Sequence, residues 1–428
     1  MRSISVLLLF GWEFDMAYVN LNMNVDKESH IIADYILESD LPLEVAAEKL
    51  AAEESTGTWT EISTTNQRIV DELGAKVFYI DKEKNFIKVA YPLGDFSWDV
   101  GGIPQFLSVV AGNFFGLEQL KSARLLDISL PEEVLKLFKG PKFGLHGVKK
   151  LMDCDKMPSI GGTVKPKIGL PAKKYGELVY LFGKGGLTSG KDDETLVNQS
   201  FCPLIDRVVA VREAIDKVKD ETGQKMLYSV NVTTRADKIL EVAENAISHG
   251  ANQLLVDVIV AGFSAVQVLA EDPSIKVPVH CHRAMHAAFT RNPKHGISMK
   301  VIGKICRLVG GDILHIGTWG VGKMHGGGQE SREYAESITQ RMGQLKPMLP
   351  MASGGLHPGS VEALVKRAGI DIQIQAGGGI AGHPDGILAG AKALRQAVDA
   401  AVRNIPVSEY AETHKELKAA LEHWGIEK

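Results

Sequence analysis

From about residue 158 onward, short apolar runs alternate with longer stretches in which apolar residues recur every three to four positions. Short apolar runs are typical of buried parallel strands, and the longer stretches are typical of amphipathic helices. Eight strand candidates follow one another, at 160–165, 187–192, 226–231, 253–257, 277–282, 312–317, 346–353 and 371–376. Helical patterns separate them, at 204–222, 236–248, 298–309, 331–345, 360–368 and 387–402. Eight strand–helix units over roughly 250 residues predict a (β/α)8 TIM barrel.

A doubly wound open sheet is the alternative to this barrel. No G-x-G-x-x-G motif follows the first strand candidate, which weakens the case for a dinucleotide-binding sheet. Eight units also suit closure better than an open sheet. We therefore expect an α/β chain whose larger part, residues 146–428, is a barrel with a helical tail.

Residues 16–145 have a mixed pattern. Strand-like alternation covers 17–25 and 76–91, and helical patterns cover 42–54, 103–115 and 131–138. This mixture predicts an α+β N-terminal domain packed on one sheet.

Residues 1–15 contain one apolar run, Ile4 to Phe10. The run is shorter than the ~20 residues that cross a bilayer. Glu13 and Asp15 follow where a signal peptide would have small residues. We interpret residues 1–15 as an N-terminal extension, with Met16 as an alternative start.

Composition narrows the class of protein. The 428 residues are 45% hydrophobic and 23% charged, which is typical of a globular chain and excludes a disordered one. A formal net charge of -4 offers no basic field for nucleic acid. Four cysteines form no C-x-x-C pair, so we expect buried thiols in a reducing cytoplasm.

Polar residues end seven of the eight strand candidates, where a TIM barrel carries its chemistry. In strand order they are Thr163, Lys165 and Lys167; Lys191, Asp193 and Glu194; Asn231; His282 and Arg283; His315; Ser353, Gly354 and Gly355; and Gly377 and Gly378. We expect these residues to meet at one end of the barrel.

The second strand end is the most informative. Strand alternation places Lys191 and Asp193 on one face and Asp192 on the other, and Glu194 joins the first pair if the strand has ended. Two carboxylates suit Mg²⁺, which prefers oxygen ligands. A lysine can become a ligand only as a carbamate, formed when its neutral amine takes up CO₂, and burial favours the neutral amine. A solvated charge cluster at a turn is the alternative interpretation.

Glycines follow the seventh and eighth strands, where barrels often bind phosphate through backbone N–H groups. Ordinary turn glycines are the alternative. Several cations fall on the same end of this net-acidic chain, which indicates a doubly anionic small substrate. These cations are Lys165, Lys167, Arg283, His315 and Lys323.

These residues resemble the large subunit of ribulose-bisphosphate carboxylase/oxygenase (RuBisCO), and most closely the archaeal type, which works without small subunits. The resemblance runs from about Tyr18 to the tail. The stretches that carry it are 53–59, 112–113, 162–167, 191–194, 282–286, 322–324, 353–355 and 377–384.

The resemblance implies a role for each matching residue. Lys191 would be the carbamylated lysine, with Asp193 and Glu194 as Mg²⁺ co-ligands. Lys165 would assist proton transfer during enolisation, and Lys323 would lie on a loop that closes over the site. The other implied substrate contacts in the barrel are Thr163, Lys167, His282, Arg283, His315, Ser353, Gly354, Gly355, Gly377 and Gly378.

Four further residues match in the N-terminal domain: Glu53, Thr58, Trp59 and Asn113. In the family such residues complete the site of the neighbouring subunit. The resemblance therefore implies a homodimer or an assembly of dimers, with no small subunit, no nucleic acid and no membrane partner.

The chain departs from the family pattern at several positions. Thr188 and Ser189 stand where the family usually has an acid and an aromatic residue, and His325 stands where an acid commonly follows the loop lysine. The stretch from Lys323 to Ser353 is also shorter than in true carboxylases. Three functions remain open: an archaeal-type carboxylase (a carbon–carbon lyase) that converts ribulose 1,5-bisphosphate to two 3-phosphoglycerates, a RuBisCO-like protein that enolises or isomerises another phosphorylated ketose without fixing CO₂, and a non-catalytic sugar-phosphate binding protein.

Overall fold

The computed structural model describes residues 5–7, 13–58, 60, 62–322 and 327–427. The chain forms two compact units. The first contains residues 1–138 and 285–305, and the second contains 139–284 and 306–428. The segment 285–305 therefore packs with the N-terminal unit, although its place in the sequence assigns it to the expected barrel range 146–428. The expected boundary at residue 145 stays a prediction.

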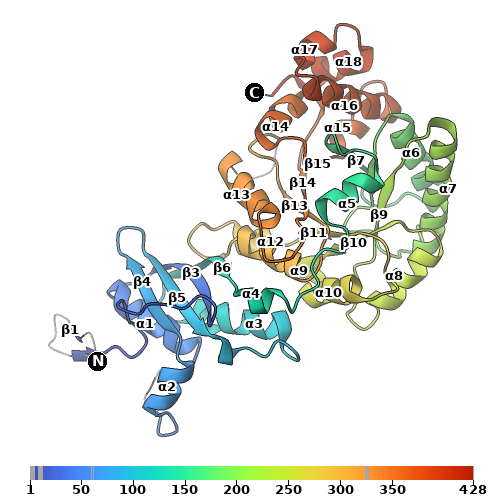
Figure 1. The fold of residues 1–428 in the computed structure, drawn as a ribbon. Coiled ribbons are helices and arrows are strands. Elements are labelled where there is room, and N and C mark those ends of the chain that lie inside the picture. The colour runs from blue at the N-terminus through green and yellow to red at the C-terminus, as the bar shows by residue number, and fades with distance from the viewer. Residues whose placement is uncertain (1–4, 8–12, 59, 61, 323–326, 428) are drawn as a thin grey trace. The chain divides into compact units, whose positions relative to one another are not determined.

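The first unit is an α+β domain built on a single five-stranded sheet, which confirms the expected class (Figure 1). The strands lie in the order β12 (Gly296–Ile297), β6 (Ser122–Ser129), β3 (His30–Glu38), β5 (Phe86–Pro92) and β4 (Lys76–Asp81). Only β12 runs parallel to its neighbour. The helices are α1 (Leu43–Glu53), α2 (Gln67–Leu73), α3 (Gly102–Val110), α4 (Glu132–Leu135) and α11 (Ala287–Thr290), with 3-10 turns η1 (Leu93–Asp95) and η2 (Asn113–Gly116). A separate pair, β1 (Ser5–Leu7) and β2 (Glu13–Asp15), precedes them.

Two expectations for this unit are wrong. Residues 17–25 form no strand and contribute only an isolated bridge from Val19 to Val77. The central strand β3 is instead absent from the sequence prediction. It is flanked by strands on both sides and mostly buried, so it lacks the hydrophobic alternation of a half-exposed strand. Its one internal charge, Asp34, is paired with Lys88 on β5 at 2.8 Å.

The second unit contains the predicted closed barrel, and all eight predicted strands are present. They are β7 (Ser159–Thr163), β8 (Ser189–Lys191), β9 (Leu227–Asn231), β10 (Gln253–Asp257), β11 (Val279–His282), β13 (Ile313–Gly317), β14 (Leu349–Ser353) and β15 (Gln373–Ala376). Each pairs in parallel with its neighbours, and β15 returns to β7. Their carboxyl ends therefore face the same way.

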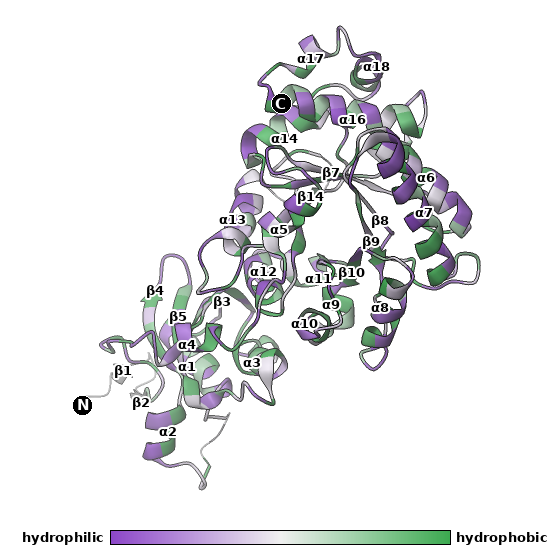
Figure 2. Ribbon diagram, turned by 45° about the vertical axis from the view of Figure 1, so that its right-hand side comes forward, coloured by the Kyte–Doolittle hydropathy of each residue, from purple (hydrophilic) through white to green (hydrophobic). Residues whose placement is uncertain are grey.

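Helices surround these strands (Figure 1). They are α5 (Gly144–Leu151), α6 (Ala172–Lys184), α7 (Leu204–Thr222), α8 (Ile239–Ser248), α9 (Val258–Ala261), α10 (Phe263–Glu271), α13 (Gly328–Thr339), α14 (Val361–Ala368), α15 (Gly378–Ala381) and α16 (Ile387–Val402), with 3-10 turn η3 (Pro358–Ser360). The tail adds α17 (Val407–Tyr410) and α18 (Lys415–Trp424), and α12 (Met299–Leu308) includes residues of both units. Figure 2 shows hydrophobic and hydrophilic residues side by side on the barrel helices, as expected of amphipathic helices that cover a sheet.

The helix predicted at 331–345 ends early, at Thr339. Arg307 explains the irregular segment that follows, because its guanidinium donates to the carbonyl oxygens of Gln340, Leu345 and Lys346. These bonds satisfy backbone groups that a continued helix would have paired internally.

Polar side chains fill much of the barrel interior. Ser229 donates to Gln253 at 2.8 Å and contacts His280 Nδ1 at 2.9 Å. Gln375 donates to Thr163 at 3.1 Å, and Gln373 donates to Ser189 at 3.1 Å. Because such groups are costly to bury unpaired, this network fixes the strand ends above which the site is built.

The cysteines agree with the expectation of buried thiols. Cys154, Cys202, Cys281 and Cys306 are all buried and free. In the described part of the chain, none of the helices combines the length and the apolar character that a membrane crossing requires.

Candidate active site

Lys191 ends strand β8 inside the barrel, with 3% of its surface exposed. Its ammonium donates to the carbonyl oxygen of Asp192 at 2.8 Å and lies 3.4 Å from Glu194 Oε2. Burial lowers the pKa of Lys191, although Glu194 and Asp193 oppose the shift. A lysine in this setting loses its proton more readily than one in water.

Asp192 points away from its two acidic neighbours, as strand alternation predicts. Its carboxylate accepts hydrogen bonds from Arg207 Nε at 3.1 Å, Tyr228 Oη at 2.7 Å and Asn231 N at 2.9 Å. Asn231, at the end of β9, also donates its side-chain amide to the carbonyl oxygen of Glu194 at 2.9 Å. Asp192 and Asn231 therefore hold the backbone that presents the two neighbouring carboxylates.

Lysines from the first strand end face those two carboxylates. Lys165 Nζ donates to Asp193 Oδ2 at 2.8 Å, and Lys167 Nζ lies 3.7 Å from Glu194 Oε1. Burial alone would raise the pKa of Glu194, but Lys191, His282 and Lys167 outweigh it and lower the pKa to about 2. Glu194 thus stands in a positive environment that favours its ionised form, and Asp193 beside it is paired with Lys165.

Two histidines occupy the next strand ends. His282, at the end of β11, hydrogen-bonds Asp257 Oδ1 through Nδ1 at 2.6 Å, and its Nε2 lies 3.6 Å from Glu194 Oε2. His315, on β13, contacts Ser353 Oγ through Nδ1 at 2.6 Å. Burial holds the pKa of His315 well below its usual range, so the ring is neutral. When Ser353 donates to Nδ1, His315 Nε2 carries the hydrogen, and this atom has no hydrogen-bond partner among the described residues.

Arg283 lies beside the same strand end as His315. A Cβ placed on Gly317, the last residue of β13, would come 3.9 Å from Arg283 Nη2. Burial lowers the pKa of Arg283 to about 10, which leaves it charged at neutral pH. Arg283 and His315 therefore place two potential anion contacts beside the end of β13.

The glycine-rich strand ends lie against the first strand end. A Cβ on Gly377 would come 3.0 Å from Lys165 Cε and 3.6 Å from Thr163 Cβ. Gly354 and Gly355, after β14, have φ values of +123° and +74°, which favour glycine. Glycine at these positions allows a close backbone approach, as an anion-binding loop requires.

Two family models of known proteins match almost the whole chain. The family described as "Ribulose bisphosphate carboxylase large chain, catalytic domain" matches residues 144–424, and the corresponding "N-terminal domain" family matches residues 17–134. The chain belongs to the RuBisCO large-chain family.

Similar RuBisCO proteins include archaeal ones of about the same length. The ribulose bisphosphate carboxylase of Pyrococcus abyssi is 40% identical over 96% of this chain and 97% of that protein. That of Methanocaldococcus jannaschii is 40% identical over 96% of this chain and 100% of that protein.

Solved RuBisCO structures share the fold. The octameric enzyme of Pyrococcus horikoshii OT3 has a TM-score of 0.90 at 39% identity, over 96% of this chain and 98% of that one. The dimeric archaeal RuBisCO of Hyperthermus butylicus has a TM-score of 0.87 at 35% identity, over 96% of this chain and 99% of that one.

Within the barrel unit, the structure brings predicted residues into contact: Lys165, Lys167, Lys191, Asp193, Glu194 and His282 form one group, and His315 contacts Ser353. Glu53, Thr58 and Asn113 belong to the N-terminal unit rather than to the barrel unit. Trp59 and Lys323 lie outside the described residues, as does His325. Their predicted roles stay predictions.

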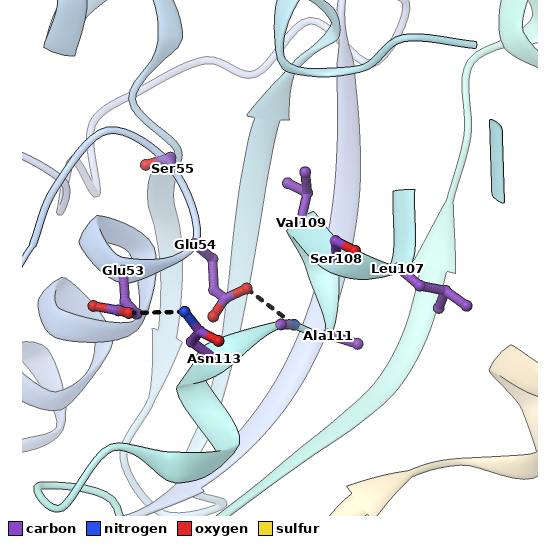
Figure 3. A pocket seen from close by; sticks show the side chains of 9 residues that line it. Glu53, Glu54, Ser55, Leu107, Ser108, Val109, Ala111 and Asn113 are labelled. Atoms are coloured by element: carbon purple, nitrogen blue, oxygen red, sulfur yellow. Dashed lines mark hydrogen bonds between the residues drawn. The ribbon is translucent and has the colours of Figure 1, made fainter. Parts of the chain in front are cut away.

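Glu53 and Asn113 line a pocket of their own in the N-terminal unit, with a volume of about 660 Å³ (Figure 3). The Asn113 side-chain amide points toward Glu53 and donates to its Oε1 at 3.5 Å. Two of the four residues that the resemblance assigns to the N-terminal domain therefore contact each other.

Several residues that support the site were not among those predicted from the sequence. Asp257 ends β10 and holds His282, and it could have been found as the polar end of the fourth strand. His280 stacks on His315, with ring centroids 4.8 Å apart, but it looks like a core position in the sequence. Glu427 in the tail accepts from Gly322 N at 2.7 Å and contacts His357 Nε2 at 3.0 Å, and no local signal identifies it.

The donor set suits a hard divalent cation. Asp193 and Glu194 offer carboxylate oxygens, and each already attracts a lysine ammonium group in the structure. No group of three or more acidic, histidine or cysteine side chains suitable for a metal occurs in the described ranges.

Proposed function

We propose that this chain is an archaeal-type ribulose bisphosphate carboxylase, which enolises ribulose 1,5-bisphosphate and adds CO₂ to give two molecules of 3-phosphoglycerate. The observation that carries the proposal is the convergence of Lys191, Asp193 and Glu194 inside the barrel of a RuBisCO large chain. The full-length similarity to archaeal carboxylases supports the same reaction.

Lys191, as a carbamate, would hold Mg²⁺ together with Asp193 and Glu194. The lowered pKa of Lys191 supports the carbamate, because only the neutral amine combines with CO₂. When bound, the cation supplies a Lewis acid that polarises the ketose carbonyl and makes the C3 proton labile.

The remaining barrel residues bind and orient the substrate. Lys165, 2.8 Å from Asp193, is placed to exchange a proton with a substrate oxygen near that carboxylate. Asp257 fixes the His282 ring through Nδ1, and Nε2 would contact the substrate hydroxyls. Arg283 and His315 would bind one phosphate.

The second phosphate would lie at the glycine-rich strand ends. Gly354, Gly355, Gly377 and Gly378 offer backbone N–H groups there, with Thr163 and Lys167 on the neighbouring strand end. Ser353, held against His315, would contact a substrate hydroxyl.

We further propose that Glu53, Thr58, Trp59 and Asn113 complete the site of a second copy of the chain, and that Lys323 covers it. A homodimer, or an assembly of dimers without a small subunit, would be the active form. Solved relatives described as dimeric and octameric support this assembly. The buried free thiols suit a reducing cytoplasm.

A carbon-fixation assay tests the proposed function. The purified protein is incubated without oxygen with Mg²⁺, labelled bicarbonate and ribulose 1,5-bisphosphate, and acid-stable label in 3-phosphoglycerate is expected. Exchange of the C3 proton without fixed carbon would contradict the carboxylase and favour a RuBisCO-like enolase or isomerase. Absence of metal-dependent exchange with every phosphorylated ketose tried would leave a sugar-phosphate binding protein.

A further inference from the structure

Glu54 is a buried carboxylate next to the Glu53–Asn113 pair. It follows helix α1, and only 5% of its surface is exposed. Its Oε2 accepts from Gly112 N at 3.0 Å, and its Oε1 accepts from Phe114 N at 2.6 Å. One carboxylate therefore binds the backbone on both sides of Asn113. Figure 3 shows one of these bonds as a dashed line that starts at the Glu54 carboxylate.

The close contact between the Glu54 carboxylate and the backbone requires glycine at position 112. A Cβ on Gly112 would come 2.5 Å from Glu54 Oε2 and 2.3 Å from the carbonyl oxygen of Ser108. No side chain fits between the carboxylate and this turn. The turn is thus shaped around Glu54, and the shape fixes where the Asn113 side chain begins.

The buried position of Glu54 makes the ionised form of its carboxylate unfavourable. Burial raises its pKa to about 7, the N–H groups of Phe114 and Gly112 lower it in part, and Glu53 raises it again. An amide or hydroxyl side chain could join helix α1 to this turn at a smaller desolvation cost. Only a carboxylate offers two oxygens that both accept and neither donates.

We propose that Glu54 is a positioning residue of the carboxylase: it holds the 112–114 backbone so that Asn113 and Glu53 face the substrate as an ordered pair. The inference rests on the proposed function and names one more residue for it. Glu54 itself lines the same pocket but acts through Asn113.

The variant Glu54→Gln tests this role in the full-length protein. A Gln side chain keeps the size but replaces one acceptor with a donor, so one of the two backbone bonds is lost. Loss of a hydrogen bond to a charged group predicts a fall in kcat/KM for ribulose 1,5-bisphosphate of about tenfold or more. Asp95→Asn is the matched control, because Asp95 lies in the same unit and burial also raises its pKa to about 7. The control should keep kcat/KM within about twofold.

A double-mutant cycle separates positioning from simple stabilisation. If Glu54 acts through Asn113, then Glu54→Gln should reduce kcat/KM by less than about twofold in an Asn113→Ala background. Its effect on the melting temperature should be the same in both backgrounds. Independent, multiplicative losses in kcat/KM would overturn the inference and leave Glu54 a purely structural residue.

Two further outcomes are decisive. If Glu54→Gln does not fold, Glu54→Asp, which keeps two acceptor oxygens on a shorter side chain, should give a smaller loss with the same dependence on Asn113. An active wild type in which neither variant changes kcat/KM would overturn this inference alone. A wild type that fixes no carbon would overturn the proposed function, and this inference with it.

Discussion

Two glutamates, one in each unit, show how the same side chain serves different purposes. Glu194 in the barrel is surrounded by Lys191, His282 and Lys167, and its pKa falls to about 2. Glu54 in the N-terminal unit is surrounded by backbone N–H groups, and its pKa rises to about 7. Cations stabilise the first carboxylate far better than amides stabilise the second.

The different surroundings of Glu194 and Glu54 indicate different roles: the first carboxylate takes part in the chemistry, and the second orients other residues. Asp193 and Glu194 lie together at one strand end and contact lysine side chains, so a metal ion could take the place of those ammonium partners. The amides around Glu54 are fixed parts of the backbone, so that carboxylate sets a conformation instead. We therefore expect substitutions in the barrel group to abolish activity and substitutions around Glu54 to reduce it.

The largest effect is expected for Lys191→Ala. Without the amine there is no carbamate, and all metal-dependent activity should be lost, a fall of at least about 10³-fold in kcat. Steady-state carboxylation and C3 proton exchange measure it. Lys149→Ala is the matched control, since Lys149 is a buried lysine of the same unit that pairs with Asp371 at 2.6 Å. Wild-type turnover in Lys191→Ala would place the chemistry elsewhere.

A smaller and more selective effect is expected for Lys323→Ala. The loop lysine is proposed to cover the site during CO₂ addition, so carboxylation should fall by about tenfold or more while C3 proton exchange is largely retained. Parallel assays of fixed label and proton exchange compare the two. Equal losses in both steps would show that this lysine does not act specifically on carboxylation.

Asp257→Asn should reduce kcat by about tenfold and change KM little. The amide can still accept from His282 Nδ1 but no longer supplies the negative charge that orients and polarises the ring. Steady-state kinetics across a series of pH values measure the split. An unchanged kcat would mean that the bond at 2.6 Å has no part in the reaction.

The smallest expected effects are changes in the free energy of unfolding with pH. Glu54 and Glu194 should change it in opposite directions. The pKa of Glu54 is raised from 4.5 to about 7, so its contribution to the free energy of unfolding is full below pH 4.5 and is lost as pH rises to about 7. The contribution of Glu194 is present above pH 4.5 and is lost as pH falls toward 2.

Urea unfolding of the wild type, Glu54→Gln and Glu194→Gln across this pH range measures both contributions. The difference between wild type and Glu54→Gln should shift by up to about 3 kcal/mol between pH 4.5 and 8. A shift of the same sign for both glutamates would contradict the contrast between the two units.

Hydrophobic patterns in the sequence predicted the barrel strands well, but they did not predict the side-chain contacts that support the site. The barrel strands are short segments that alternate regularly with amphipathic helices, so all eight could be found although β8 consists of Ser189, Gly190 and Lys191. The opposed directions of Asp192 and Asp193 also follow from strand alternation alone. In contrast, β3 lies between two other strands and shows no clear alternation, and 17–25 alternates without pairing as a strand.

The tertiary partners of supporting residues could not be found in this way, even where, as for Asp257, the residue's place at a strand end could. Asp257 and Glu54 are each one acidic residue among 52 in the chain. Asp257 matters because β10 and β11 are neighbours, and Glu54 matters because a turn 58 residues later closes on it. Only the folded chain shows these pairs.

The central claim is that CO₂ converts Lys191 into the third ligand of a metal site. Carbon-13 NMR of the protein incubated with ¹³C-bicarbonate and Mg²⁺ tests it most directly. We predict one carbamate signal per chain in the wild type and in Lys149→Ala, and none in Lys191→Ala. A carboxylase that is active but shows no such signal, or a signal that persists in Lys191→Ala, would contradict the account.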